Sequence, residues 1–148
     1  MAGYDRAVLL DNSAWARVLL GRLPRHRLAL WREAVAADEV YTCPPFELEA
    51  LYSARDERSY DELELELGGL RLASADDQTW FMAQRAQREL SRAPGVSHRV
   101  KPIDLLIATI AAQHSLAVLH YDADFDVIAQ HSSLDFGSLW IAERGSMS

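Results

Sequence analysis

The stretch KPIDLLIATIAAQHSLAVLHYDADFDVIA, residues 101–129, contains the clearest fold signal in this sequence of 148 residues. Its first part, IDLLIATIAAQ, is apolar on almost every side, which predicts a helix buried against a sheet. The next run, LAVLHY, is typical of a buried parallel strand, and DADFDVIA begins another helix with an acidic first turn. Helix, strand and helix in this order predict part of an α/β sheet.

The rest of the sequence shows the same alternation of strand and helix signals. We expect short strands at residues 7–10, 40–43, 70–73 and 139–141. We expect helices at residues 13–20 and 25–37, a helix that begins at Pro45, one that begins after Ser59 and ends at Gly68, and one that begins at Asp76 or Asp77. Ser59 with Glu62 matches a capping box. Trp80 stands at helical spacing with Ala83 and Leu90 and is interpreted as a core residue.

The length predicts one domain covering residues 1–148, and the alternation of strands and helices predicts an α/β fold with helices on both faces of the sheet. The hydrophobic content of 49% and charged content of 25% are ordinary for a soluble protein. No apolar run approaches the roughly 18 residues of a membrane span, and the apolar run within MAGYDRAVLLD is too short for a signal peptide and meets an Asp at once. We therefore expect cytoplasmic residence without a membrane anchor. The single cysteine, Cys43, excludes an intramolecular disulfide and is interpreted as a small core residue.

The net charge of −7 argues against a general electrostatic attraction to nucleic acid. The basic residues are nevertheless clustered along the chain, with Arg55 close to Arg58 and Arg99 close to Lys101. Positive patches of this kind can flank a negative centre, although solvated arginines on helix faces are an equally good explanation for any one cluster.

Four acidic residues occupy positions that an open α/β sheet brings together. Asp11 follows the apolar run VLL and Asp122 follows LAVLHY, while Glu49 and Asp104 lie near the starts of helices behind prolines. Ligands of such sheets bind outside the carboxyl ends of the strands. Each residue alone has a simpler explanation, as a helix cap or as a first-turn acid. Together they predict a carboxylate cluster, whose mutual repulsion a divalent cation would neutralise.

A carboxylate cluster of this kind suits phosphodiester hydrolysis. Mg²⁺ and Mn²⁺ prefer carboxylate oxygens and lower the pKa of a bound water, and the pocket would hold one ion or two about 3.5–4 Å apart. Ser13 could add a hydroxyl ligand or hold a water, although helix capping is its simpler role. Rival chemistries fit less well, because the sequence has no P-loop, no G-x-S-x-G motif and no second Asp two residues after Asp11. His120, inside a strand-like run, is interpreted as a packing residue.

Several segments resemble the PIN-domain ribonucleases, specifically the VapC-type toxins of bacterial toxin–antitoxin pairs. They are VLLDNSAW, PPFELEALYSAR, PIDLLIATIA, VLHYDADFDVIA and LWIAERG, which together span nearly the whole chain. Departures from the family pattern are small: Asn12 stands where Thr is common, and Ser115 stands where Gly often ends the helix. The resemblance implies a three-layer α/β/α fold with a central mainly parallel sheet.

The resemblance also assigns roles to residues. It implies that Asp11, Glu49 rather than Glu47, Asp104 and Asp122 are the catalytic metal ligands, with Asp124 as a secondary candidate ligand. The activity implied is Mg²⁺- or Mn²⁺-dependent cleavage of RNA by a homodimer that a VapB-like antitoxin inhibits. Arg55, Arg58, Arg99 and Lys101 are candidate contacts to RNA phosphates. The main alternative is a PIN-like module that binds RNA or protein without turnover, and a small phosphatase is a third, remote possibility.

Overall fold

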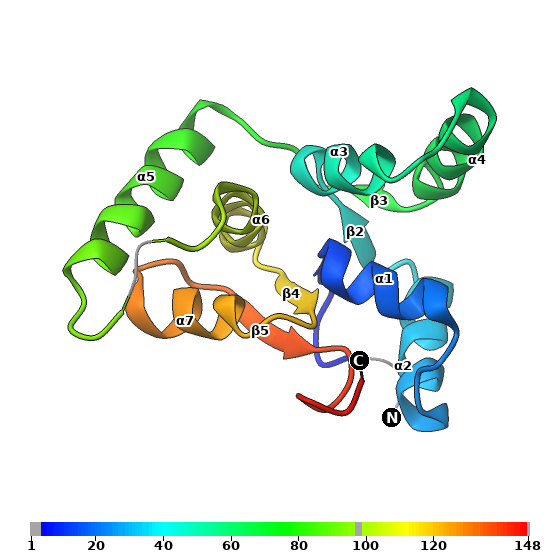
Figure 1. Cartoon of the computed structure of the whole chain (residues 1–148). Helices are drawn as coiled ribbons and strands as arrows, with labels where there is room; N and C mark the ends of the chain where they lie inside the picture. Colours follow the sequence, from blue (N-terminus) through cyan, green and yellow to red (C-terminus); the bar gives the residue numbers. More distant parts are fainter. Residues whose placement is uncertain (1–3, 97–98, 148) are drawn as a thin grey trace.

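The structure is a computed structural model of the chain and describes residues 4–96 and 99–147 (Figure 1). Within these residues the elements are β1 (Val8–Leu10), α1 (Asn12–Leu20), α2 (Arg25–Ala36), β2 (Val40–Thr42), α3 (Pro44–Tyr52), α4 (Glu57–Leu67), β3 (Arg71–Leu72), α5 (Asp77–Arg92), α6 (Pro102–Gln113), β4 (Ala117–His120), α7 (Asp124–His131) and β5 (Gly137–Trp140). The predicted alternation of strands and helices is confirmed, with boundaries shifted by a few residues at most.

The strands of the described residues form one five-stranded sheet in the order β3-β2-β1-β4-β5, and every pairing is parallel. From β1 the chain builds β2 and β3 outward on one side, then crosses to the other side of β1 to build β4 and β5. The strand order therefore reverses between β1 and β4. In open α/β sheets this switch point, at the carboxyl ends of the strands, is where ligands bind.

The middle of the sheet is apolar and enclosed. All three residues of β1 and all four of β4 are buried. Both strands are near-continuous apolar runs in the sequence, and such runs are typical of strands that are covered on both faces. The helix α6 is buried on most of its surface, and Ile107 and Ile110 are completely inaccessible to solvent. Helices cover both faces of the sheet, which confirms the three-layer α/β/α fold (Figure 1).

The capping box of α4 was predicted at the wrong residues. The helix begins at Glu57, so Ser59 is its third residue and not its cap. Asp56 is the cap: its carboxylate accepts a hydrogen bond from the Ser59 backbone N–H at 2.9 Å, and the Ser59 hydroxyl accepts one from Asp56 N at 3.2 Å. Asp is among the best N-cap residues, and its preference outweighed the Ser59–Glu62 pattern.

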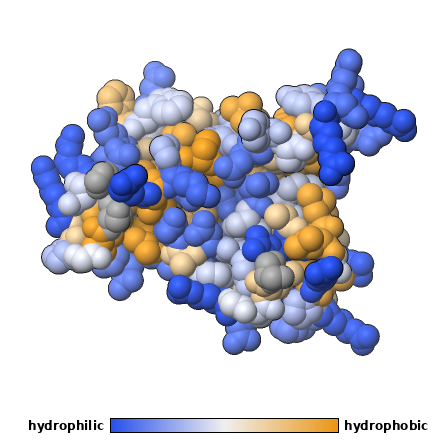
Figure 2. All heavy atoms as spheres, in the orientation of Figure 1, coloured by the Kyte–Doolittle hydropathy of each residue, from blue (hydrophilic) through white to orange (hydrophobic). Residues whose placement is uncertain are grey.

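Trp80 is not a core residue, contrary to the prediction. Its side chain is 62% exposed, and Phe81 beside it is 67% exposed. The buried stripe of α5 consists of Thr79, Ala83, Ala86 and Leu90, at helical spacing. That stripe of mostly small residues faces the molecule and leaves both aromatic rings on the outer side. Figure 2 shows apolar residues exposed among hydrophilic ones on the face seen in Figure 1.

No helix in the described part of the chain is both long enough and apolar enough to cross a lipid bilayer. Cys43 is a free thiol buried in the core, as predicted.

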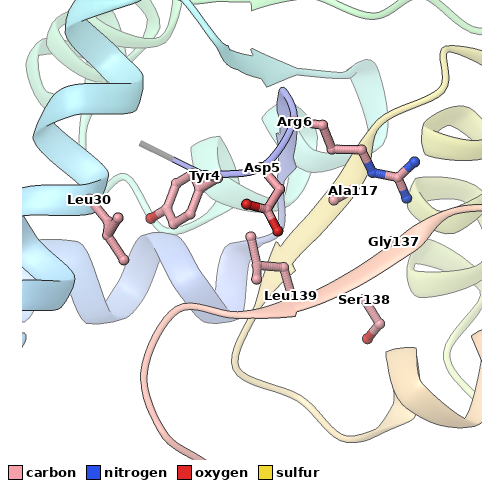
Figure 3. A pocket seen from close by; sticks show the side chains of 8 residues that line it. All are labelled: Tyr4, Asp5, Arg6, Leu30, Ala117, Gly137, Ser138 and Leu139. Carbon is pink, nitrogen blue, oxygen red and sulfur yellow. The ribbon is translucent and has the colours of Figure 1, made fainter. Parts of the chain in front are cut away.

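A hollow of about 330 Å³ lies beside β5, near the start of that strand and of β4 (Figure 3). Its lining includes Tyr4, Arg6 and Gly137. The guanidinium of Arg6 lies over Gly137, so close that a β-carbon built on Gly137 would be 2.5 Å from Arg6 Nη2 and 2.8 Å from Ala117 Cβ. This hollow is at the opposite end of the strands from Asp11 and Asp122, the candidate site residues.

We predict that Gly137→Ala lowers the free energy of unfolding by about 1–3 kcal/mol, the usual cost of overpacking. Arg6 can swing away, but the Ala117 β-carbon is fixed to the backbone of the paired strand. Urea denaturation of the two proteins measures the difference. The matched control is Gly69→Ala, whose nearest neighbour outside its chain neighbours is the Glu66 carbonyl oxygen at 3.4 Å; an equal loss in both variants would contradict the packing explanation.

Candidate metal centre

Two acidic residues flank the switch point of the sheet. Asp11 directly follows β1, and Asp122 lies two residues beyond the end of β4, the strand paired with β1 through Leu10 and Leu119. The Asp11 backbone N–H donates to the Leu119 carbonyl oxygen at 3.0 Å, which extends the pairing by one residue. The sheet therefore places both carboxylates at the same edge, as the sequence predicts.

Asp122 belongs to a compact group with Asp104 and Asp124. One carboxylate oxygen of each residue lies within 4.8 Å of the others, and among the described residues this is the group with the spacing of a metal site. Asp104 comes from the first turn of α6 and is buried, while Asp122 from the connection after β4 and Asp124 from the first turn of α7 are half-buried. Asp124, a secondary candidate in the sequence, is thus as close to the centre as Asp122.

Asp11 and Glu49 are not members of this compact group, but their charges act on it. Burial raises the pKa of Asp104 to about 7, and the negative charges of Asp11, Asp122 and Glu49 act in the same direction. Burial also raises the pKa of Glu49, again assisted by Asp11. The four residues that the sequence selected therefore share one electrostatic neighbourhood. Two of them, Asp104 and Asp122, form the compact group with Asp124, and the other two, Asp11 and Glu49, act on it through their charges.

Glu47, the other acid of α3, is engaged elsewhere. Its carboxylate accepts a hydrogen bond from the Thr42 hydroxyl at 3.2 Å. This contact agrees with the preference for Glu49 as the member of the acidic neighbourhood. The helix itself begins at Pro44, one residue before the predicted Pro45.

Two buried carboxylate oxygens of the centre have no hydrogen-bond partner in the described part of the chain. Asp11 Oδ1 and Asp104 Oδ2 are buried, and neither has a hydrogen-bond partner within the described residues. Both side chains are only 3% exposed. Buried polar atoms are almost always hydrogen-bonded or bound to a cation. Carboxylate oxygens without donors, beside further carboxylates, have the donor chemistry that a hard divalent cation requires.

Ser13 fixes the orientation of Asp11. The Ser13 backbone N–H and hydroxyl both donate to Asp11 Oδ2, at 2.9 and 2.5 Å. The same hydroxyl accepts a hydrogen bond from the Tyr121 backbone N–H at 2.8 Å. Asp11 is therefore the N-cap of α1, as its simpler explanation proposed. Its other oxygen, Oδ1, has no hydrogen-bond partner within residues 4–96 and 99–147.

His120 is more than the packing residue that the sequence predicted. It is completely buried, and its Nδ1 accepts a hydrogen bond from the Asp122 backbone N–H at 3.1 Å. Burial lowers the pKa of His120 to about 4, so its ring is neutral near pH 7. Sequence reasoning missed this contact because a histidine in an apolar strand carries no signal of the atom that it binds.

The four basic candidates differ in their surroundings. Lys101 immediately precedes α6, and its charge lowers the pKa values of Glu49, Asp104 and Asp124, against the larger effect of burial. Arg58 forms an exposed ion pair with Glu62 on α4. Arg55 and Arg99 are exposed. The structure thus places Lys101 close to the carboxylates.

Comparison with known proteins agrees with this architecture. The family model of the PIN domain matches residues 8–130. Ribonuclease VapC18 of Mycobacterium tuberculosis strain H37Rv is 35% identical over 139 residues, which cover 93% of this chain and 97% of the relative. Ribonuclease VapC17 of the same strain is 34% identical over 121 residues, covering 82% of this chain and 86% of the relative.

Solved structures show the same fold. The DNA-bound VapBC complex from Salmonella typhimurium includes a chain that superposes with a TM-score of 0.71 at 17% identity, covering 93% of this chain and 99% of that one. A chain of VapBC-5 from Mycobacterium tuberculosis superposes with a TM-score of 0.59 at 23% identity, covering 90% and 98%. From the family match and these relatives, the chain belongs to the PIN domain family, among the VapC ribonucleases.

Proposed function

We propose that the protein is a VapC-like toxin, a divalent-metal-dependent endoribonuclease that hydrolyses RNA phosphodiesters in the cytoplasm as a single PIN-like domain. The observation that supports this most directly is the group of Asp104, Asp122 and Asp124 at the switch point of the sheet. Asp104 Oδ2 in this group and Asp11 Oδ1 are buried without a hydrogen-bond partner among the described residues. The relatives that are 34–35% identical to this chain in sequence are named ribonucleases. The carboxylates supply the chemistry that such an activity needs.

The residues that would hold Mg²⁺ or Mn²⁺ are Asp104, Asp122 and Asp124, with Asp11 Oδ1 and Glu49 completing the acidic neighbourhood. When bound, the cation supplies an activated water at neutral pH and stabilises charge on the attacking and leaving oxygens. The chain provides the ordered carboxylates: Ser13 holds one oxygen of Asp11 and leaves the other free.

Lys101 is the basic residue that the structure best supports as an RNA contact. Its positive charge lies close enough to act on three of the carboxylates, so it can bind a phosphate next to the scissile one. Contacts from Arg55, Arg58 and Arg99 stay predictions. With a net charge of −7, the protein would bind RNA through a local patch at the site.

An apolar groove suits an antitoxin helix. It is lined by residues of α1 and α2, including Trp15 and Trp31 with ring centroids 6.4 Å apart, and by Glu66, Gly69 and Leu70 from the end of α4 and the segment after it. Leu19 and Val35 are 61% and 40% exposed at its edge, and Figure 2 shows an apolar area over α1. A VapB-like antitoxin could lay an amphipathic helix in this groove and place an Arg among the carboxylates.

A homodimer belongs to the same proposal. Trp80 and Phe81 on the outer side of α5, and Tyr52, which is 91% exposed on α3, offer apolar area that a second copy could cover. The alternative function, a PIN-like module without turnover, would use the same surfaces. This module would differ from the proposed endoribonuclease in that it would bind RNA or protein without cleaving RNA.

We predict that the purified protein cleaves RNA with Mg²⁺ or Mn²⁺, and that Asp104→Asn abolishes cleavage. The substitution keeps the shape of the side chain but removes the buried negative charge that would bind the cation. Gel analysis of RNA fragments, with and without EDTA, measures the effect. RNA binding without cleavage by the wild-type protein would favour the non-catalytic module, and full activity of the variant would exclude Asp104 from the mechanism.

We also predict that the metal-free protein loses stability as the pH rises from about 4 to about 7. The folded-state pKa of Asp104, about 7, lies above its unfolded value, so the folded state retains a proton that the unfolded state has lost. Asp104→Asn should reduce this loss and stabilise the metal-free protein at pH 7.5. Urea midpoints in EDTA at several pH values test this, with the exposed Asp61→Asn as control; a parallel slope in wild type and Asp104→Asn would contradict it.

For the groove, we predict that Leu19→Glu weakens antitoxin binding at least about tenfold and leaves RNA cleavage unchanged. A charge at the apolar edge would have to be desolvated when a helix docks. Isothermal titration with a VapB-like antitoxin that binds the wild-type protein measures the affinity. The exposed Leu65→Glu on α4 is the matched control, and equal affinity for both variants would place the antitoxin elsewhere.

A further inference from the structure

We propose that His120 is a positioning residue for the metal centre: its buried imidazole holds the backbone N–H of Asp122 and so sets the direction of the Asp122 and Asp124 carboxylates. The consequence for metal binding rests on the proposed function. The positioning itself is a property of the metal-free chain.

The hydrogen bonds around His120 have one consistent direction. Nδ1 accepts from Asp122 N at 3.1 Å, so the proton of a neutral ring is on Nε2 and is donated to Ser138 Oγ at 2.7 Å. The Ser138 hydroxyl then donates to Asp126 Oδ1 at 2.5 Å. The second oxygen of Asp126 accepts from Trp140 Nε1 at 2.9 Å. Because the Ser138 hydroxyl gives its proton to the Asp126 carboxylate, it must accept the proton of His120 Nε2. The Nδ1 atom is then unprotonated and accepts the Asp122 N–H.

The ring is also held by packing. It stacks on Phe125 with a centroid distance of 5.0 Å and an interplanar angle of 29°, and it meets the edge of Trp140 at 5.0 Å and 63°. Ser138 and Trp140 belong to β5, whose strand pairs with β4. Figure 3 shows the Ser138 side chain on the opposite side of β5 from Leu139, toward α7. Contacts from α7 and β5 therefore fix the position of Nδ1.

The bond to Asp122 fixes the start of a short turn. Asp122 Oδ1 accepts from the Asp124 backbone N–H at 2.9 Å, and its carbonyl oxygen accepts from Phe125 N at 3.2 Å. Moving the Asp122 backbone would therefore move both carboxylates that face Asp104. Partners outside the ligand sphere that orient metal ligands commonly change metal affinity 10–100-fold when they are replaced.

Two amide substitutions, each replacing one ring nitrogen, separate positioning from packing. In His120→Asn the amide oxygen can take the place of Nδ1 and accept from Asp122 N, whereas in His120→Gln the amide nitrogen can take the place of Nε2 and donate to Ser138. Both variants lose the same ring contacts, so similar melting temperatures are expected. We expect His120→Gln to weaken Mn²⁺ binding about tenfold or more, and His120→Asn to remain within about threefold of wild type. Electron paramagnetic resonance with Mn²⁺ measures the affinities.

Hydrogen exchange of the Asp122 amide in the metal-free protein gives a second measurement. It should be fast in His120→Gln and slow in wild type and His120→Asn. Equal Mn²⁺ affinity and equal exchange in the two variants would overturn the positioning role. A wild-type protein that binds no Mn²⁺ but shows the expected exchange difference would overturn the proposed function and leave the positioning role standing.

A third measurement needs no variant and applies even if both variants fail to fold. The ¹⁵N chemical shifts of the His120 ring in the wild-type protein should show a protonated Nε2 and an unprotonated Nδ1. A proton on Nδ1 would prevent that atom from accepting the Asp122 N–H and would overturn the proposal.

Discussion

The parallel pairing of β1 with β4 is the constraint on which the rest of the site depends. It brings the end of one strand, with Asp11, beside the end of the other, with Asp122, although 110 residues separate them in the sequence. The strands are buried, so the two carboxylates approach in surroundings where water screens them poorly. The first turns of α6 and α7 then add Asp104 and Asp124 to the same edge.

This cluster of buried carboxylates lowers the free energy of unfolding of the metal-free chain. Burial raises the pKa values of Asp11, Asp104 and Glu49, which means that the folded state disfavours their charges. Asp11 Oδ1 and Asp104 Oδ2 are buried without donors among the described residues. Apolar burial elsewhere, above all in β1, β4 and α6, offsets this cost. Natural proteins tolerate such local conflicts mainly at functional sites.

Sequence patterns predicted the parts of the structure that depend on local signals. The apolar runs identified β1, β4 and α6, and the acids that follow or open these elements identified the neighbourhood of the centre. Trp80 was misplaced because small residues, not aromatic ones, form the buried stripe of α5. The contact of His120 with Asp122 was not predictable, because it depends on Ser138 and Asp126, which only the tertiary fold brings to the ring.

The end of β4 shows how the fold makes a site out of a strand terminus. The backbone N–H groups of Tyr121 and Asp122 lie beyond the last paired residue of the strand, where water or a side chain must satisfy them. Ser13 accepts from the first and His120 from the second. Ser13 also holds Asp11, so a single hydroxyl joins the carboxylate after β1 to the backbone after β4. At this point the acceptors are therefore side chains and not a neighbouring strand. These hydrogen bonds hold the backbone that carries the carboxylates in place after the sheet has ended.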